Sequence, residues 1–226
     1  MLKIGSFFDE LIGELQKDTI TTIYGPPGCG KSTICFQYAI SCVKNGKKVL
    51  YVDTEGGFSV ERVKQIMPNI DLSQIIVFSP KDFEDQKKVI LNLNKQIKNS
   101  SSIGLIIIDS LVMLYRLKLE DAPQKINTQL AQQLQLLTEI SRTFHIPIIV
   151  TNQMYQHFDT KEKKMVGGSL IEYWSKTIVE IDKDQDIRTI ILKKHKYKKE
   201  GESKKFEINQ AGIEESKNRS FSLFRN

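Results

Sequence analysis

The fold is decided by the stretch Thr19-Ile20-Thr21-Thr22-Ile23-Tyr24-Gly25-Pro26-Pro27-Gly28-Cys29-Gly30-Lys31-Ser32-Thr33. A run rich in β-branched residues ends at Gly25, and the spacing Gly25-x4-Gly30-Lys31-Ser32 is that of a P-loop between a strand and a helix. The glycines let several backbone N–H groups point inward, and the following helix adds its positive end. This arrangement suits phosphate, so the stretch predicts ATP as a ligand.

The predicted ATP-binding residues are Gly25, Pro26, Pro27, Gly28, Cys29, Gly30, Lys31, Ser32 and Thr33. Lys31 supplies a mobile positive charge for the β- and γ-phosphates, which gives it a catalytic role as well. The hydroxyl of Ser32 is expected to ligate Mg²⁺.

Composition and length indicate a globular protein. The chain has 226 residues, of which 40% are hydrophobic and 27% charged. This fits one domain over residues 1–226, with 1–18 as a short N-terminal segment and 214–226 as a flexible tail. No apolar run approaches the ~18 residues of a membrane span, and the N-terminus lacks a signal pattern, so we expect a cytoplasmic protein with no membrane association.

The pattern of apolar runs predicts an α/β fold. Five apolar strands alternate with helices, and they are expected at residues 19–25, 48–53, 75–78, 105–109 and 147–151. This order favours a central, mostly parallel sheet flanked by helices. Three further strands, at 177–181, 188–194 and 205–208, suggest a C-terminal antiparallel extension. Residues 154–168 are predicted to form a long mobile loop, and 111–124 allow no assignment.

Polar residues follow the predicted strands where each one ends. Ligands bind at the carboxyl ends of the strands in such sheets, so these side chains are expected to converge. Asp109 follows four apolar residues, which is the Walker B form, and would hold Mg²⁺ through water. Glu55 would act as general base on the attacking water if its strand lies beside that of Asp109. Gln153 would sense the γ-phosphate and signal to the loop that follows it.

Three segments resemble the archaeal and eukaryotic RecA-type recombinases. The stretch 51–62 is similar to their second-strand motif, and 105–116 to their Walker B strand and first DNA loop. Residues 148–153, with Val166-Gly167-Gly168, resemble the strand and the end of their second DNA loop. The similarity runs from about Gly5 to Gly212 and is strongest to the short archaeal paralogues that consist of the core alone. The P-loop sequence Pro26-Pro27-Gly28-Cys29 also resembles that of KaiC-like ATPases.

The resemblance implies a RecA-type P-loop NTPase core that acts in DNA repair and homologous recombination. Such paralogues bind ATP, hydrolyse it weakly, bind single-stranded or branched DNA and do not drive strand exchange. They are thought to assist the main archaeal recombinase and to influence cleavage of branched DNA by a junction resolvase. By carry-over, Arg62 would lie against the adenine, and Tyr115 and Arg116 would belong to the first DNA loop.

The chain also departs from the main recombinases. It shows neither their N-terminal helix-hairpin-helix domain nor their Phe-x-x-Ala docking motif. Homo-oligomers remain possible, but autonomous filament formation is not expected.

The distribution of charge suggests where DNA would bind. The net charge is +6, and residues 193–205 hold seven lysines against two glutamates. Aromatic residues can stack on bases while lysines neutralise phosphates, the combination expected for single strands. Outside the first DNA loop, the predicted DNA contacts are Tyr155, Phe158, Lys161, Lys163, Lys164, Lys193, Lys194 and Lys196.

Other interpretations of these features remain open. The segment 154–168 could be only a solvated loop. The lysine-rich segment could be a charged edge that prevents strand aggregation, or one lysine could reach a neighbouring subunit's ATP. Two other functions also remain: a KaiC-like signalling ATPase without a DNA role, and a scaffold that ATP stabilises.

Overall fold

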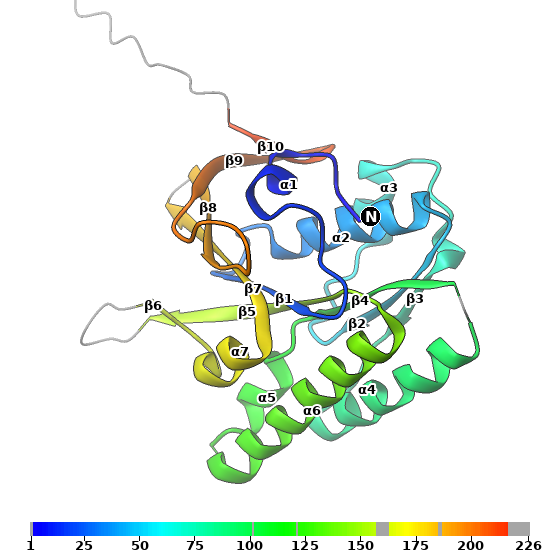
Figure 1. The fold of residues 1–226 in the computed structure, drawn as a ribbon, viewed down its shortest axis with the longest axis vertical. Coiled ribbons are helices and arrows are strands. Elements are labelled where there is room, and N and C mark those ends of the chain that lie inside the picture. The colour runs from blue at the N-terminus through cyan, green and yellow to red at the C-terminus, as the bar shows by residue number, and fades with distance from the viewer. Residues whose placement is uncertain (1, 101, 121, 157–162, 185–186, 217–226) are drawn as a thin grey trace, which may run out of the picture.

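The computed structural model describes residues 2–100, 102–120, 122–156, 163–184 and 187–216. Its strands follow the order β10-β9-β8-β7-β1-β5-β4-β2-β3, and β6 pairs with β5 at one side (Figure 1). The parallel members are β1 (Ile20–Gly25), β2 (Lys48–Asp53), β3 (Ile75–Phe78), β4 (Ile103–Asp109), β5 (Ile148–Gln156) and β7 (Ser175–Asp184). The antiparallel members are β6 (Lys163–Met165), β8 (Ile187–Lys194), β9 (Ser203–Asn209) and β10 (Gly212–Glu215).

Helices cover both faces of the sheet (Figure 1). One face carries α1 (Phe7–Ile12), α2 (Lys31–Lys44) and α3 (Val60–Ile66), and the other carries α4 (Phe83–Lys98), α5 (Met113–Lys118), α6 (Pro123–Phe144) and α7 (Gly168–Trp174). A 3-10 turn, Leu72–Gln74, precedes β3. Alternate residues of β2 enter the two cores, with Val49 and Tyr51 on the α2 side and Leu50 and Val52 on the α4 side. This explains the apolar strands, because both faces of each central strand are buried.

The predicted mostly parallel sheet with an antiparallel extension is confirmed. Three details differ from the prediction. β7 pairs parallel with β1 and not antiparallel, because the chain crosses back through α7 before it enters the sheet. Residues 113–118, which the sequence left unassigned, form α5. Glu214 and Glu215, expected in a flexible tail, belong to β10, where they pair with β9.

The predicted loop at 154–168 is a β-hairpin at its base. β5 continues to Gln156, and β6 pairs with it antiparallel, with Met154 opposite Met165 and Tyr155 opposite Lys164. Met165 is buried, so the hairpin base packs on the core. The sequence did not reveal β6 because its two lysines resemble the residues of a solvated loop. No helix in the described part of the chain is long and apolar enough to cross a membrane.

The N-terminal helix packs against the C-terminal strands. Ser6 and Asp9 cap α1 in a reciprocal capping box. The Phe7 ring lies 5.7 Å from that of Phe206 in β9, and Phe8 meets Tyr38 edge to face at 6.0 Å. The first contact joins the two ends of the described chain, and the second fixes α1 on α2.

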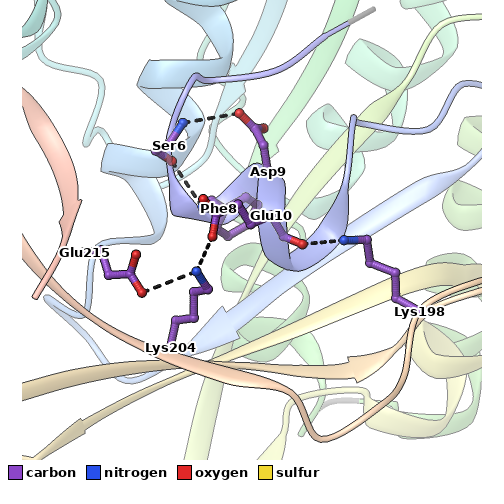
Figure 2. Close-up of polar contacts among 7 residues, drawn as sticks. All are labelled: Ser6, Phe8, Asp9, Glu10, Lys198, Lys204 and Glu215. Atoms are coloured by element: carbon purple, nitrogen blue, oxygen red, sulfur yellow. Dashed lines mark hydrogen bonds and ion pairs between the residues drawn. The ribbon is translucent and has the colours of Figure 1, made fainter.

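Polar contacts reinforce this junction (Figure 2). The Glu10 carboxylate accepts a hydrogen bond from Lys204, which also lies 3.3 Å from Glu215, and the Lys198 ammonium donates to the Glu10 carbonyl. These exposed ion pairs contribute little individually. The aromatic residues therefore provide most of the stability of the junction.

Replacing Phe8 with Ala should reduce the free energy of unfolding by about 3–5 kcal/mol, because the ring is completely buried and its removal leaves a cavity. Urea denaturation measures this loss. Leu117→Ala is the control, since its side chain is 65% exposed and its loss should cost less than about 0.5 kcal/mol. Equal effects of the two substitutions would contradict the packing described here.

The turn between β8 and β9 should respond to pH through His195. Its Nδ1 accepts backbone N–H bonds from Tyr197 at 3.1 Å and Lys198 at 3.0 Å, and burial lowers the pKa of the imidazole. The folded state favours neutral His195, whose pKa is about 6.5 in the unfolded chain. The contribution of His195 to stability is therefore complete above about pH 6.5, and it is lost as the pH falls through the lower pKa of the folded state. Thermal unfolding at pH 7.5 and 5.5 should show a larger loss for wild type than for His195→Asn, whose oxygen can still accept both bonds. The same loss in both proteins would show that His195 has no such effect.

Candidate nucleotide-binding site and DNA surface

The P-loop lies between β1 and α2, as predicted. The loop needs glycine at Gly25, because a Cβ there would lie 2.3 Å from the carbonyl oxygen of Ile181 in β7. Gly28 and Gly30 have φ values of 68° and 113°, in the left-handed region that favours glycine. The loop borders a pocket of about 270 Å³, which is lined by Pro27, Gly28, Gly30, Lys31, Ser32, Thr33, Glu55, Asp109, Gln153 and Ile208.

The P-loop side of this pocket carries positively charged and hydrogen-bond-donating groups. α2 starts at Lys31, so its unpaired N–H groups and its dipole face the loop. The Lys31 ammonium donates to the carbonyl oxygens of Gly25 and Pro26, each at 2.9 Å, which keeps the charge beside the loop. The donor set therefore suits the phosphates of a nucleotide.

The ends of four neighbouring strands bring the predicted polar residues together. β2 pairs with β4 so that Asp53 lies opposite Asp109, and β1 pairs with β5 so that Gly25 lies opposite Gln153. The predicted role of Glu55 required its strand to lie beside that of Asp109, and β2 and β4 are indeed neighbours. The Oε1 atom of Glu55 accepts hydrogen bonds from the Ser110 hydroxyl at 2.7 Å and from the Gln153 amide at 2.8 Å.

Asp109 is fixed by two side chains that the sequence analysis missed. The Tyr51 hydroxyl donates to its Oδ2 at 2.7 Å, and the Thr151 hydroxyl donates to its Oδ1. Burial and the charge of Asp109 raise the pKa of Tyr51 well above its usual value, so the phenol stays a donor. Both residues could have been found in the sequence, because each carries a hydroxyl group directly after apolar residues of a predicted strand.

The oxygen atoms of Asp109 and Ser32 fit a hard cation. No group of three or more His, Cys, Asp or Glu side chains in the described residues forms a metal cage. Mg²⁺ usually takes one or two protein oxygens together with substrate phosphates and water, and this pocket offers that arrangement.

Asp53 shapes the turn that presents Glu55. Its carboxylate accepts the backbone N–H groups of Glu55, Gly57 and Phe58 at 3.2, 3.1 and 2.9 Å. The Thr54 hydroxyl donates to the Ser110 carbonyl at 2.7 Å and accepts from the Ser110 N–H at 2.9 Å. These bonds hold the ends of β2 and β4 together, and the sequence analysis did not predict the Thr54 contact.

Arg62 lies on α3 and holds the turn between β9 and β10. Its guanidinium donates to the Asn209 carbonyl at 2.6 Å and to that of Gln210 at 3.4 Å. Ile208, just before this turn, lines the P-loop pocket. The contact of Arg62 with adenine stays a prediction.

The two residues of the predicted first DNA loop behave differently. Tyr115 is only 3% exposed, its hydroxyl donates to Asn127 at 2.6 Å, and its ring packs on Phe83. The ring is thus held in the core, and the role of Tyr115 as a DNA contact stays a prediction. Arg116 is exposed, and its guanidinium donates to the Gln153 side-chain oxygen at 3.1 Å.

The other predicted DNA residues that the structure describes lie on two hairpins. Tyr155 is 44% exposed and Lys164 is exposed on the β5–β6 hairpin. Lys163 is placed in β6 by its backbone pairing. Phe158 and Lys161 lie outside the described residues.

The lysines of the β8–β9 segment have partners within the chain. Lys193 lies 3.3 Å from the Glu180 carboxylate, and Lys194 donates to the Glu172 carbonyl at 2.6 Å. Lys196 lies 4.9 Å from the centre of the Tyr197 ring. Lys193 and Lys194 would therefore have to share their charge with these partners to contact DNA.

Known proteins resemble this chain over nearly its whole length. Residues 2–216 match the Rad51 family model. The DNA repair and recombination protein RadB of Methanococcus maripaludis is 42% identical, covering 91% of this chain and 96% of the relative. RadB of Methanosphaera stadtmanae is 40% identical over 94% and 95%, and RadB of Methanocaldococcus jannaschii is 42% identical over 90% and 96%.

A solved structure agrees with these matches. The crystal structure of the RadB recombinase superposes with a TM-score of 0.82 at 34% identity, covering 96% of this chain and 100% of that one. The fold, the site geometry and the relatives lead to one assignment. The chain belongs to the Rad51 family and, within it, to the RadB group of DNA repair and recombination proteins.

Proposed function

We propose that the protein is an ATP-dependent, DNA-binding accessory of homologous recombination. The observation that carries this proposal is the meeting of Lys31, Glu55, Asp109 and Gln153 in one pocket of a Rad51-family chain. In this function it assists the main archaeal recombinase in the cytoplasm, does not itself drive strand exchange, and influences cleavage of branched DNA by a junction resolvase.

Different residues of the site bind different parts of the nucleotide. The loop N–H groups and Lys31 bind the β- and γ-phosphates. Arg62, which does not line the pocket and donates to the Asn209 carbonyl, would have to turn away from that contact to lie against the adenine. Ser32 and Asp109 hold Mg²⁺, which offsets the phosphate charge when bound. Glu55 accepts hydrogen bonds from Ser110 and Gln153 and retains lone pairs with which to orient the attacking water.

Replacing Lys31 with Ala should weaken Mg-ATP binding by about 100-fold, since a charge-assisted contact contributes roughly 1.5–3 kcal/mol and the loop also loses its cation. Isothermal titration calorimetry measures the affinity. Lys44→Ala removes the same charge from the other end of α2 and should bind Mg-ATP like wild type. Unchanged affinity in Lys31→Ala would overturn the nucleotide assignment.

Hydrolysis by the isolated protein should be slower than about 1 s⁻¹, the low end of typical enzymes. Among the described residues that line the pocket, Lys31 is the sole cation, whereas an added arginine typically raises phosphoryl-transfer rates by about 10³- to 10⁵-fold. Glu55→Gln should reduce the rate a further ~10²- to 10⁴-fold. A phosphate-release assay under saturating Mg-ATP tests both statements. They fail if turnover is fast or if Glu55→Gln hydrolyses ATP like wild type.

We place DNA binding on a surface formed by Arg116, Tyr155, Lys163, Lys164 and the β8–β9 lysines. These residues supply cations and one accessible aromatic ring, as single-stranded DNA requires. Arg116 also contacts Gln153, which lines the nucleotide pocket.

Removing these lysines should reduce the salt dependence of DNA binding. Each lost phosphate contact should lower the slope of log K against log salt by ~0.7 for single strands. Fluorescence anisotropy with Lys164→Ala and Lys196→Ala, singly and together, measures the slope. Lys95→Ala with Lys98→Ala on α4 is the charge-matched control. Wild-type slopes in all variants would exclude this surface and favour a KaiC-like ATPase or a scaffold.

A further inference from the structure

A second hollow lies beside the nucleotide pocket, and β5 contributes to both. Gln153 lines the nucleotide pocket, and Tyr155, two residues further along β5, lines a hollow of about 760 Å³. This volume falls in the range of small-ligand sites, roughly 300–1,000 Å³. Its wall comes from β1, β5, β6, α5, α6, α7 and β8, so the β5–β6 hairpin and α7 both border it.

Three tyrosines contribute to the wall. Tyr24 and Tyr115 are almost fully buried, and their hydroxyls are held by Glu180 at 2.7 Å and Asn127 at 2.6 Å. Tyr155 differs because 44% of it is exposed, so its ring is accessible to a ligand. The wall therefore has a fixed aromatic part and one accessible ring.

The other parts of the hollow are open and polar. A Cβ on Gly168 would have no heavy atom nearer than 4.0 Å, so there is free space beside the start of α7. Glu172 lines the same hollow, and its carboxylate can accept a hydrogen bond from an N–H of a base, either an exocyclic amino group or the ring N3–H of uracil or thymine. Lys164 and Lys193 stand among the lining residues as the two cations, and Lys193 lies 3.3 Å from Glu180.

We propose that this hollow holds one unstacked base of single-stranded DNA. The base stacks on Tyr155, its polar edge faces Glu172, and the adjoining phosphate lies near Lys164 and Lys193. A base in duplex DNA is paired and stacked between its neighbours, so it would have to be flipped out to enter. The hollow therefore favours single strands over duplex. This inference rests on the proposed DNA-binding function and adds the binding site for the base.

Photocrosslinking tests the position of the base directly. Single-stranded DNA with 5-iodouracil at one position is mixed with the full chain, irradiated, and mapped by mass spectrometry. Fluorescence anisotropy on the same DNA, without irradiation, measures binding independently. The expected crosslink is on Tyr155, and a duplex of the same sequence should give much less of it.

Two substitutions should weaken single-strand binding for different reasons. Tyr155→Leu removes the accessible ring and should raise Kd about 5- to 150-fold, the change that corresponds to roughly 1–3 kcal/mol of stacking per base. Gly168→Leu leaves the ring in place but fills the free space, and should give a similar loss. Tyr155→Phe should bind like wild type. Tyr173→Leu is the matched control, since Tyr173 is 73% exposed and does not line the hollow.

The outcomes separate this inference from the proposed function. DNA binding with crosslinks elsewhere, or with wild-type affinity in both Tyr155→Leu and Gly168→Leu, would overturn the base site and leave DNA binding intact. No binding of single-stranded or branched DNA by the wild-type chain would overturn the proposed function itself.

Discussion

The parallel alignment of β2, β4, β5 and β1 is the constraint on which the candidate site depends. Hydrogen-bonded neighbours in a sheet lie about 4.8 Å apart, so residues at the ends of adjacent strands necessarily meet. Asp53 lies opposite Asp109, and Gln153 opposite Gly25. Both faces of these strands are buried, and a slip of one residue would exchange the faces of every side chain. Packing of the two cores thus sets the positions of the candidate catalytic groups.

The side-chain amide of Gln153 links the P-loop pocket to the proposed DNA surface. Its nitrogen donates to Glu55 and its oxygen accepts from Arg116, so one planar group contacts both. Rotation of this amide in response to a γ-phosphate would change the contact with Arg116 on α5. Gln153 also begins the part of β5 that carries Tyr155 into the hairpin. The polar network and the covalent chain therefore offer two routes between the sites.

The sequence predicted well those features that depend on local spacing. The P-loop, the apolar strands and the acidic residues at their ends all follow from neighbours within a few positions. It did not reveal the contacts that depend on packing between distant parts of the chain. Tyr115 follows the Walker B strand in a familiar pattern, but Phe83 and Asn127 hold it inside the core. Likewise, Thr151 and Tyr51 meet Asp109 only because the sheet brings their strands together.

The most direct test of the link between the two sites is the affinity for single-stranded DNA with and without a non-hydrolysable Mg-ATP analogue. In wild type the two Kd values should differ by at least about 5-fold, the lower end of typical coupling between sites. In Gln153→Met, which keeps the side-chain length but loses both hydrogen bonds, the ratio should fall to about 1. A ratio that is the same in both proteins would contradict the role of Gln153.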